Sequence, residues 1–169
     1  VNNKNGDKVY NVTKILDDLL KKYDPRQRPR SAERNSPTIV LVDFYVRSMS
    51  RITELDMEYK FECYFRQKWT DSRLAYKSGP NVLTVNIKML ERLWKPDTFF
   101  VNSYSANVHR VPSTNKFFRI FKDGTIRYSM RLTITAKCPM QLESFPIDTQ
   151  NCPIHIASCN SIIVLHFAF

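Results

Sequence analysis

Glycine and cysteine are scarce in this chain of 169 residues, and several well-known sequence motifs are missing from it. With only 3 glycines, it is not a glycine-rich low-complexity chain. Its 4 cysteines are too few for a disulfide-dense scaffold, and no two of them have the C-x-x-C spacing of a zinc site. No G-x-S-x-G, H-E-x-x-H or phosphate-binding loop occurs, and the 3 histidines are isolated. We therefore expect neither an enzyme nor a bound cofactor or metal.

The chain also lacks a long hydrophobic run. Its longest stretch without Asp, Glu, Lys or Arg includes residues 152–169, and polar side chains interrupt this stretch repeatedly. The apolar part, Ile162–Leu165, is far shorter than the roughly 20 residues that cross a bilayer as a helix. We expect no transmembrane helix in this chain, whose length leaves room for one domain with a substantial core.

Negative charge is in deficit, because 16 acidic residues stand against 26 basic ones and give a net charge of +10. A basic surface can bind nucleic acid, heparin-like polymers or anionic lipid, or it can concentrate small anions. The densest basic cluster, at positions 26, 28, 30 and 34, lies in a stretch interrupted by proline. No helix-turn-helix, RRM or zinc-knuckle pattern accompanies it, so we do not expect nucleic acid as a partner.

Residues 11–24 have the periodicity of an amphipathic helix. Asn11 is a candidate N-cap, and Pro25 ends the pattern before a polar linker over residues 25–37. Asn11 also opens the only N-x-[ST] triplet, which makes it the candidate N-glycosylation site. The apolar positions recur at i, i+3, i+4, i+7, i+8 and i+11, which is one stripe of a helix: Val12, Ile15, Leu16, Leu19, Leu20 and Tyr23.

Beyond the linker the hydrophobic period changes to two, which is typical of half-buried strands. The first such strand alternates apolar residues at 40, 42, 44 and 46 with Leu41, Asp43, Tyr45 and Arg47. Further short strands follow, and no second helical segment of comparable strength occurs. The sequence therefore predicts an all-β fold, an immunoglobulin-like β-sandwich with an N-terminal α-helix.

The segment 58–66 predicts a strand with one chemically distinct face. Its odd positions are apolar and would face the core, so Tyr64 and Arg66 would share the outer face. An Arg beside a Tyr is common on an ordinary solvated face. The same pair also suits a small carboxylate, because Arg offers a bidentate fork and the ring excludes water.

Residues 117–121 and 125–136 flank Lys122-Asp123-Gly124 and predict a β-hairpin. With a three-residue loop and Gly124 in the left-handed conformation, the numbers of paired residues sum to an even value. Arg119 then joins Arg127, Ser129 and Arg131 on the polar face. A two-residue turn would send Arg119 to the opposite face. We favour the three-residue loop.

Cys138 and Cys152 enclose thirteen residues, with Phe145-Pro146 and Asp148 between them. Two thiols at this separation can close a loop of about fifteen residues. An aromatic-Pro dipeptide can adopt a cis bond in a tight turn. On spacing alone, the pair is consistent with an ordinary structural disulfide in a secreted domain.

The amino-acid sequences of several segments are far more specific to one family than the cysteine spacing is. Together with the 138–152 loop, they resemble, in order, the Cys-loop family of pentameric ligand-gated ion channels, and most of all its GABA type A branch. The resemblance covers about residues 10–156. The segments are Tyr64-Phe65-Arg66-Gln67-Lys68-Trp69, Asp71-Ser72-Arg73-Leu74, Trp94-Lys95-Pro96-Asp97-Thr98-Phe99-Phe100 and Asp123-Gly124-Thr125.

The resemblance implies a ligand-binding domain on the extracellular side of a postsynaptic membrane, in a homo- or heteropentamer of receptor subunits. It implies a Cys138–Cys152 disulfide and an unpaired Cys63. It also implies that a small amino-acid transmitter such as GABA binds between subunits, with arginine holding its carboxylate. Phe99 matches an aromatic position of the principal face, where rings hold the ammonium. The positions that match the complementary face are Tyr64, Arg66, Arg119, Ser129 and Arg131.

The resemblance stops after Ile156, and residues 157–169 read as a divergent tail. We expect residues 1–10 to be an N-terminal tail, and residues 11–156 to be the ligand-binding domain, incomplete at its C-terminus. A chain of this kind would not conduct ions alone, and with an uncovered edge it would be prone to aggregate. The alternatives to a GABA-gated chloride channel subunit are a non-conducting module that pairs with full-length subunits and a basic polymer-binding protein.

Overall fold

The computed structural model describes residues 12–29, 37–50, 52–110, 115–159 and 161–166, and Asn11, the expected N-cap and glycosylation site, lies outside them. No helix in the described part of the chain is long and apolar enough to cross a membrane. The elements in chain order are α1 (Val12–Leu20), β1 (Thr38–Met49), β2 (Glu58–Thr70), the 3₁₀ helix η1 (Ser72–Leu74), β3 (Val82–Thr84), the 3₁₀ helix η2 (Ile87–Arg92), β4 (Phe99–Phe100), β5 (Ser103–Val108), β6 (Lys116–Phe121), β7 (Thr125–Lys137), β8 (Ile156–Ala157) and β9 (Ser161–His166).

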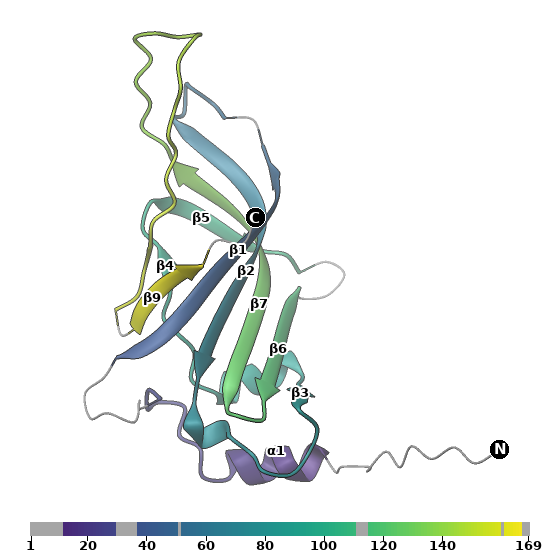
Figure 1. The fold of residues 1–169 in the computed structure, drawn as a ribbon. Helices are drawn as coiled ribbons and strands as arrows, with labels where there is room; N and C mark the ends of the chain where they lie inside the picture. The colour runs from purple at the N-terminus through teal and green to yellow at the C-terminus, as the bar shows by residue number, and fades with distance from the viewer. Residues whose placement is uncertain (1–11, 30–36, 51, 111–114, 160, 167–169) are drawn as a thin grey trace, which may run out of the picture.

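Most strands belong to one twisted sheet of seven strands (Figure 1). Its order is β3-β6-β7-β2-β1-β9, and β5 also pairs with β7. The strands pair in antiparallel fashion except β1 and β9, which are parallel. A second sheet, β4–β8, places Phe100 against Phe44 and Phe65 of the large sheet, with ring centroids 6.1 and 5.3 Å apart. The predicted two-layer β fold with an N-terminal helix is confirmed, and the core lies between the two sheets.

Strand β2 shows why the alternating pattern predicts this core. Its side chains at 59, 61, 63, 65, 67 and 69 are all buried, while their neighbours are half-buried or exposed. Because successive side chains of a strand point to opposite faces, one face of β2 forms part of the core and the other is the outer face of the sheet. Cys63 is buried and unpaired as expected, and burial raises the pKa of its thiol to about 12.

Two expectations about local structure are wrong in part. Helix α1 ends at Leu20, short of the predicted 24, and Tyr23 lies in the turn that follows. Val46 was expected to face the core with Val40 and Val42, but its side chain is 49% exposed. Val46 still lies opposite Cys63, and the register of β1 against β2 shifts only after it, between Val46 and Ser48. The alternation of buried and exposed side chains in β1 therefore ends at Phe44, where the regular pairing with β2 is about to end.

A buried polar network joins the turn after α1 to the sheet. Asp71 is 1% exposed, and both of its carboxylate oxygens accept hydrogen bonds from the Arg73 guanidinium, at 2.9 and 2.7 Å. The Tyr23 hydroxyl donates to Asp71 at 2.8 Å and accepts from the Trp94 backbone N–H at 3.2 Å. The Arg73 guanidinium lies over the Tyr23 ring, 4.3 Å from its centroid. Burial, more than any other cause, raises the pKa of Tyr23.

The hairpin β6–β7 has the three-residue loop that the sequence favoured. Arg119 pairs with Arg127 and Ile120 with Ile126, so the paired numbers sum to 246. Gly124 has φ +82°, and a Cβ there would lie 2.4 Å from the Asp71 carbonyl oxygen. Only glycine fits this position without a shift of the backbone, because the left-handed conformation and the close approach both exclude a side chain. Arg119 therefore lies on the same face as Arg127.

Candidate functional site

The outer face of the large sheet carries the polar residues that the sequence singled out. On β2, Tyr64 and Arg66 alternate with buried core residues, so both point away from the core. Across the strand pair, Tyr64 lies opposite Arg131, and Arg66 lies opposite Ser129. The structure thus brings four of the expected complementary-face residues together on two adjacent strands, with Arg119 next to them on β6.

A hollow of about 410 Å³ lies over Tyr64, Arg66 and Ser129. The other two expected residues, Arg119 and Arg131, are not among its lining residues. Its size is within the range of about 300–1,000 Å³ that is usual for small-molecule sites. Two aromatic rings and two arginines line it together with the hydroxyl groups of Tyr64 and Ser129, a combination that suits a small anion or zwitterion. The lining residues are Tyr64, Arg66, Phe117, Arg127 and Ser129.

Arg66 has an acidic neighbour in the sheet. Its guanidinium donates to the carboxylate of Asp43 at 3.2 Å, and both side chains are partly exposed, at 32% and 22%. The other oxygen of Asp43 is buried and has no hydrogen-bond partner among the described residues. The Arg66 guanidinium also lies 5.6 Å from the centroid of the Tyr45 ring. Arg66 is therefore held in place by a carboxylate that a ligand carboxylate would compete with.

Arg131 is held by a different acid. It donates a short hydrogen bond to Glu62, which also accepts from Arg47 at 3.1 Å. The hydrogen bond from Arg131 is the largest cause of a lowered pKa at Glu62, and the charges of Arg131, Arg47 and His109 lower it further. Arg47 lies 5.8 Å from the centroid of the Tyr64 ring. Glu62 is thus an anion that pairs with both Arg47 and Arg131, neither of which lines the hollow.

Phe99 is not brought to this face. It lies on β4, in the second sheet, and is 46% exposed. Its neighbour Phe100 points to the core and packs on Phe65. Because Phe65 and Arg66 point to opposite faces of β2, the large sheet separates Phe99 from Arg66 within one copy of the chain. The sequence neighbours of these two residues are connected, because the Gln67 side-chain amide donates a partly buried hydrogen bond to the Thr98 hydroxyl at 2.7 Å.

Sequence reasoning alone missed Asp43 and Glu62 as partners of the arginines, and Phe117 as a wall of the hollow. The alternation of β1 already placed Asp43 away from the core. Its pairing with Arg66 depends on the register of β1 against β2, where the two residues lie opposite each other. Such a register joins segments far apart in sequence and has no local signal.

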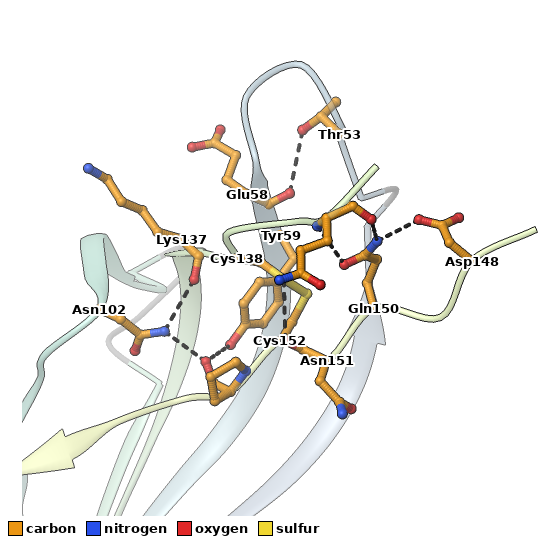
Figure 2. The surroundings of a disulfide bond; sticks show 12 residues. Thr53, Glu58, Tyr59, Asn102, Lys137, Cys138, Asp148, Gln150, Asn151 and Cys152 are labelled. Atoms are coloured by element: carbon orange, nitrogen blue, oxygen red, sulfur yellow. Dashed lines mark hydrogen bonds between the residues drawn. A yellow bond between two sulfur atoms is a disulfide. The ribbon is translucent and has the colours of Figure 1, made fainter. Parts of the chain in front are cut away.

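The predicted disulfide between Cys138 and Cys152 is present, with Cα atoms 5.0 Å apart. It closes the loop that extends from the sheet at the end opposite to α1 (Figure 1). Within the loop, Phe145-Pro146 is cis, and the Gln150 amide donates to the Gln141 carbonyl at 2.8 Å and to Asp148 (Figure 2). Asp148 thus accepts a hydrogen bond within the loop.

The base of the loop is tied to the sheet by two polar side chains, as Figure 2 shows. The Tyr59 hydroxyl donates to the Pro153 carbonyl at 2.9 Å, and the Asn102 amide donates to the same oxygen at 2.7 Å. The Asn102 amide also donates to the Lys137 carbonyl at 3.3 Å, which joins the two ends of the loop. The loop therefore has a fixed base even where its tip is exposed.

We expect that replacing both Cys138 and Cys152 by alanine lowers the free energy of unfolding by about 3 kcal/mol, because the open chain regains the entropy of a loop of about fifteen residues. Urea unfolding read by pulse proteolysis measures this difference. The matched control is Cys159→Ala, because Cys159 is exposed and free. Cys63 is not suitable as a control, because it is buried and its replacement would itself disturb the core. Equal stability of the double variant and the Cys159→Ala variant would contradict the prediction.

Comparisons with known proteins support one family. The sequence model of the family "Neurotransmitter-gated ion-channel ligand binding domain" matches residues 12–161 of this chain. The chain is 45% identical over 148 residues to "Gamma-aminobutyric acid receptor alpha-like" of Drosophila melanogaster, covering 88% of this chain and 21% of that protein. It is 45% identical over 146 residues to "Gamma-aminobutyric acid receptor subunit alpha-2" of Rattus norvegicus, covering 86% and 32%. It is 43% identical over 147 residues to "Gamma-aminobutyric acid receptor subunit gamma-3" of Homo sapiens, covering 87% and 31%. The chain thus spans about a fifth to a third of the length of these relatives.

Proposed function

Because the chain belongs to the neurotransmitter-gated ion-channel ligand binding domain family, we propose that it is the extracellular ligand-binding part of a GABA-gated chloride channel subunit. In this proposal, residues 11–156 form the domain, which lies on the outer side of a postsynaptic plasma membrane. Its partners are other subunits of a homo- or heteropentamer. The ligand is a small amino-acid transmitter, γ-aminobutyrate.

The observation that carries the proposal is the position of Arg66 in the lining of the hollow, between Tyr64 and Ser129. A guanidinium binds a carboxylate through two parallel N–H groups, and this charge-assisted contact is among the strong polar contacts of proteins. The Tyr64 ring limits access of water on one side, and the Ser129 hydroxyl can donate to the same carboxylate. The Arg66 guanidinium already donates a hydrogen bond to the Asp43 carboxylate. A transmitter would offer it the same kind of acceptor group.

A complete site in this proposal needs two subunits. The ammonium of γ-aminobutyrate requires an aromatic or acidic partner several ångströms from Arg66. Phe99, which we propose for the principal face, is on the other side of the large sheet in the same copy. A ligand that contacts both residue types would therefore lie between Arg66 of one subunit and an aromatic residue of the next. We accordingly propose the complementary role for Tyr64, Arg66, Arg119, Ser129 and Arg131.

A chimera tests the proposal. Residues 11–156 would replace the matching segment of the rat alpha-2 subunit, which would be expressed with the partner subunits that alpha-2 requires. We expect γ-aminobutyrate to elicit a chloride current in these cells. Labelling of the chimera at the cell surface shows whether it has assembled. A chimera that reaches the surface and gives no current with this transmitter would contradict the proposal.

A further inference from the structure

Three basic residues stand in one row across the outer face, one step nearer to the β6–β7 turn than Arg66. Lys68 on β2 lies directly opposite Arg127 on β7, and Arg127 lies directly opposite Arg119 on β6. Side chains in directly opposite positions have Cβ atoms only about 4.5–5.5 Å apart, and like charges in this arrangement destabilise a sheet. The row therefore has an energetic cost in the absence of an anion.

The neighbouring basic residues of this face do not share the problem. Arg66 pairs with Asp43, and Arg47 and Arg131 both pair with Glu62. In the described parts of the chain, no ion pair is found for the three residues of the row. Arg119 instead lies over the Phe117 ring, 4.4 Å from its centroid.

The acidic groups near the row are already engaged. Asp43 accepts from Arg66, and the Asp123 carboxylate accepts from the Thr125 backbone N–H and hydroxyl, both at 2.9 Å. The charge of Lys68 contributes to a lowered pKa of Asp123, but the hydrogen bonds from Thr125 are the larger causes. The row thus keeps an excess of positive charge.

The row borders a second hollow of about 360 Å³. Arg66 and Arg127 line both this hollow and the first one, so the two are neighbours that share a wall of guanidinium groups. The second hollow is lined by Leu41, Asp43, Arg66, Gln67, Lys68, Phe121 and Arg127. Three basic groups with one engaged acid and apolar walls suit an oxyanion, because guanidinium forks match its oxygen geometry and the walls reduce competition from water.

We propose that Lys68 and Arg127, supported by Arg119, form an oxyanion subsite next to the transmitter site. Its ligand is either free sulfate or phosphate, or the second acidic group of a ligand whose first carboxylate binds Arg66. The second of these sources rests on the proposed function, whereas the subsite itself does not.

Titration of the 169-residue chain with sodium sulfate, at an ionic strength held constant with sodium chloride, tests the subsite by calorimetry. We expect saturable sulfate binding that Lys68→Gln/Arg127→Gln weakens at least tenfold. Lys88→Gln/Arg92→Gln is the matched control, because it removes the same charge at two exposed positions of η2, outside the row. It should change the sulfate affinity less than twofold. No sulfate binding, or an equal loss in both double variants, would overturn the proposal, the latter by showing only a diffuse positive field.

The source of the oxyanion is tested in the chimera described above. Glutamate has one carboxylate more than γ-aminobutyrate, so a ligand-borne second acid predicts a glutamate response that Lys68→Gln reduces at least tenfold. Lys68 lines only the second hollow, whereas Arg127 lines both, so Lys68→Gln alone should change the γ-aminobutyrate response less than twofold. If Lys68→Gln/Arg127→Gln abolishes sulfate binding by the chain and the chimera gives no glutamate response, the ligand of the subsite is a free inorganic oxyanion. A chimera without a γ-aminobutyrate response that still binds sulfate through the row would separate failure of the proposed function from failure of the subsite.

Discussion

Replacement of Arg66 by alanine is expected to raise the concentration of γ-aminobutyrate for half-maximal current at least tenfold in the chimera. Loss of a charge-assisted bidentate contact costs on the order of 2 kcal/mol or more, and about 1.4 kcal/mol corresponds to a factor of ten in affinity. Arg66→Lys keeps the charge but loses the planar fork, so it should recover only part of the sensitivity. Arg92→Ala, at an exposed position of η2, is the matched control and should leave the response unchanged.

A substitution of Asp43 should change the γ-aminobutyrate sensitivity in the opposite direction. Its carboxylate competes with the ligand for the Arg66 guanidinium. Asp43→Asn removes the competing charge with little change of shape, so the half-maximal concentration should fall. An unchanged half-maximal concentration in Arg66→Ala would exclude Arg66 as the main contact of the carboxylate. A rise in Asp43→Asn would show that Asp43 positions Arg66 and does not compete with the ligand.

The second large effect concerns stability. Asp71→Ala should lower the free energy of unfolding by about 3 kcal/mol, because it leaves the Arg73 guanidinium and the Tyr23 hydroxyl without their shared acceptor. Asp71→Asn keeps one acceptor oxygen and the volume of the side chain, so its effect should be smaller. Pulse proteolysis in urea measures both variants.

The exposed pair of Asp24 and Arg26 offers a control for this prediction within the same turn. Its atoms are 3.1 Å apart, and the Arg26 side chain is 89% exposed. Exposed ion pairs contribute little to stability because solvent screens them, so Asp24→Ala should leave the unfolding transition almost unchanged. If Asp24→Ala and Asp71→Ala had equal effects, the buried network would not be what anchors the turn.

Local pattern was enough to predict the parts of the fold that depend on local geometry. The alternation over 58–66 placed the buried face of β2 correctly, and Gly124 with its three-residue loop predicted the register that puts Arg119 beside Arg127. Turn chemistry fixes a hairpin register, because the two strands are joined by the turn itself. The residue pairs of the outer face that lie within this hairpin were therefore predictable.

Features that depend on contacts between distant segments were not predictable in the same way. The irregularity in β1 that begins just after Val46 arises in its pairing with β2. The pairing of β4 with β8 and the parallel pairing of β9 with β1 join segments separated by more than fifty residues. Helix α1 ends at Leu20, and Tyr23, which the apolar stripe placed in the helix, hydrogen-bonds to Asp71, 48 positions away in the sequence. In each case a tertiary partner decided between local alternatives.

The hydrogen bond from Gln67 to Thr98 has a consequence for a ring of such domains. Gln67 adjoins Arg66, and Thr98 adjoins Phe99, so one short bridge connects two residues that would serve different interfaces of the same subunit. Gln67 is 3% exposed, and its side chain has little room to move without breaking the bridge. A displacement of Arg66 toward a ligand would then pull on the backbone that carries Phe99. In the proposed receptor, binding at one subunit interface would in this way be mechanically coupled to the next interface through the body of each subunit.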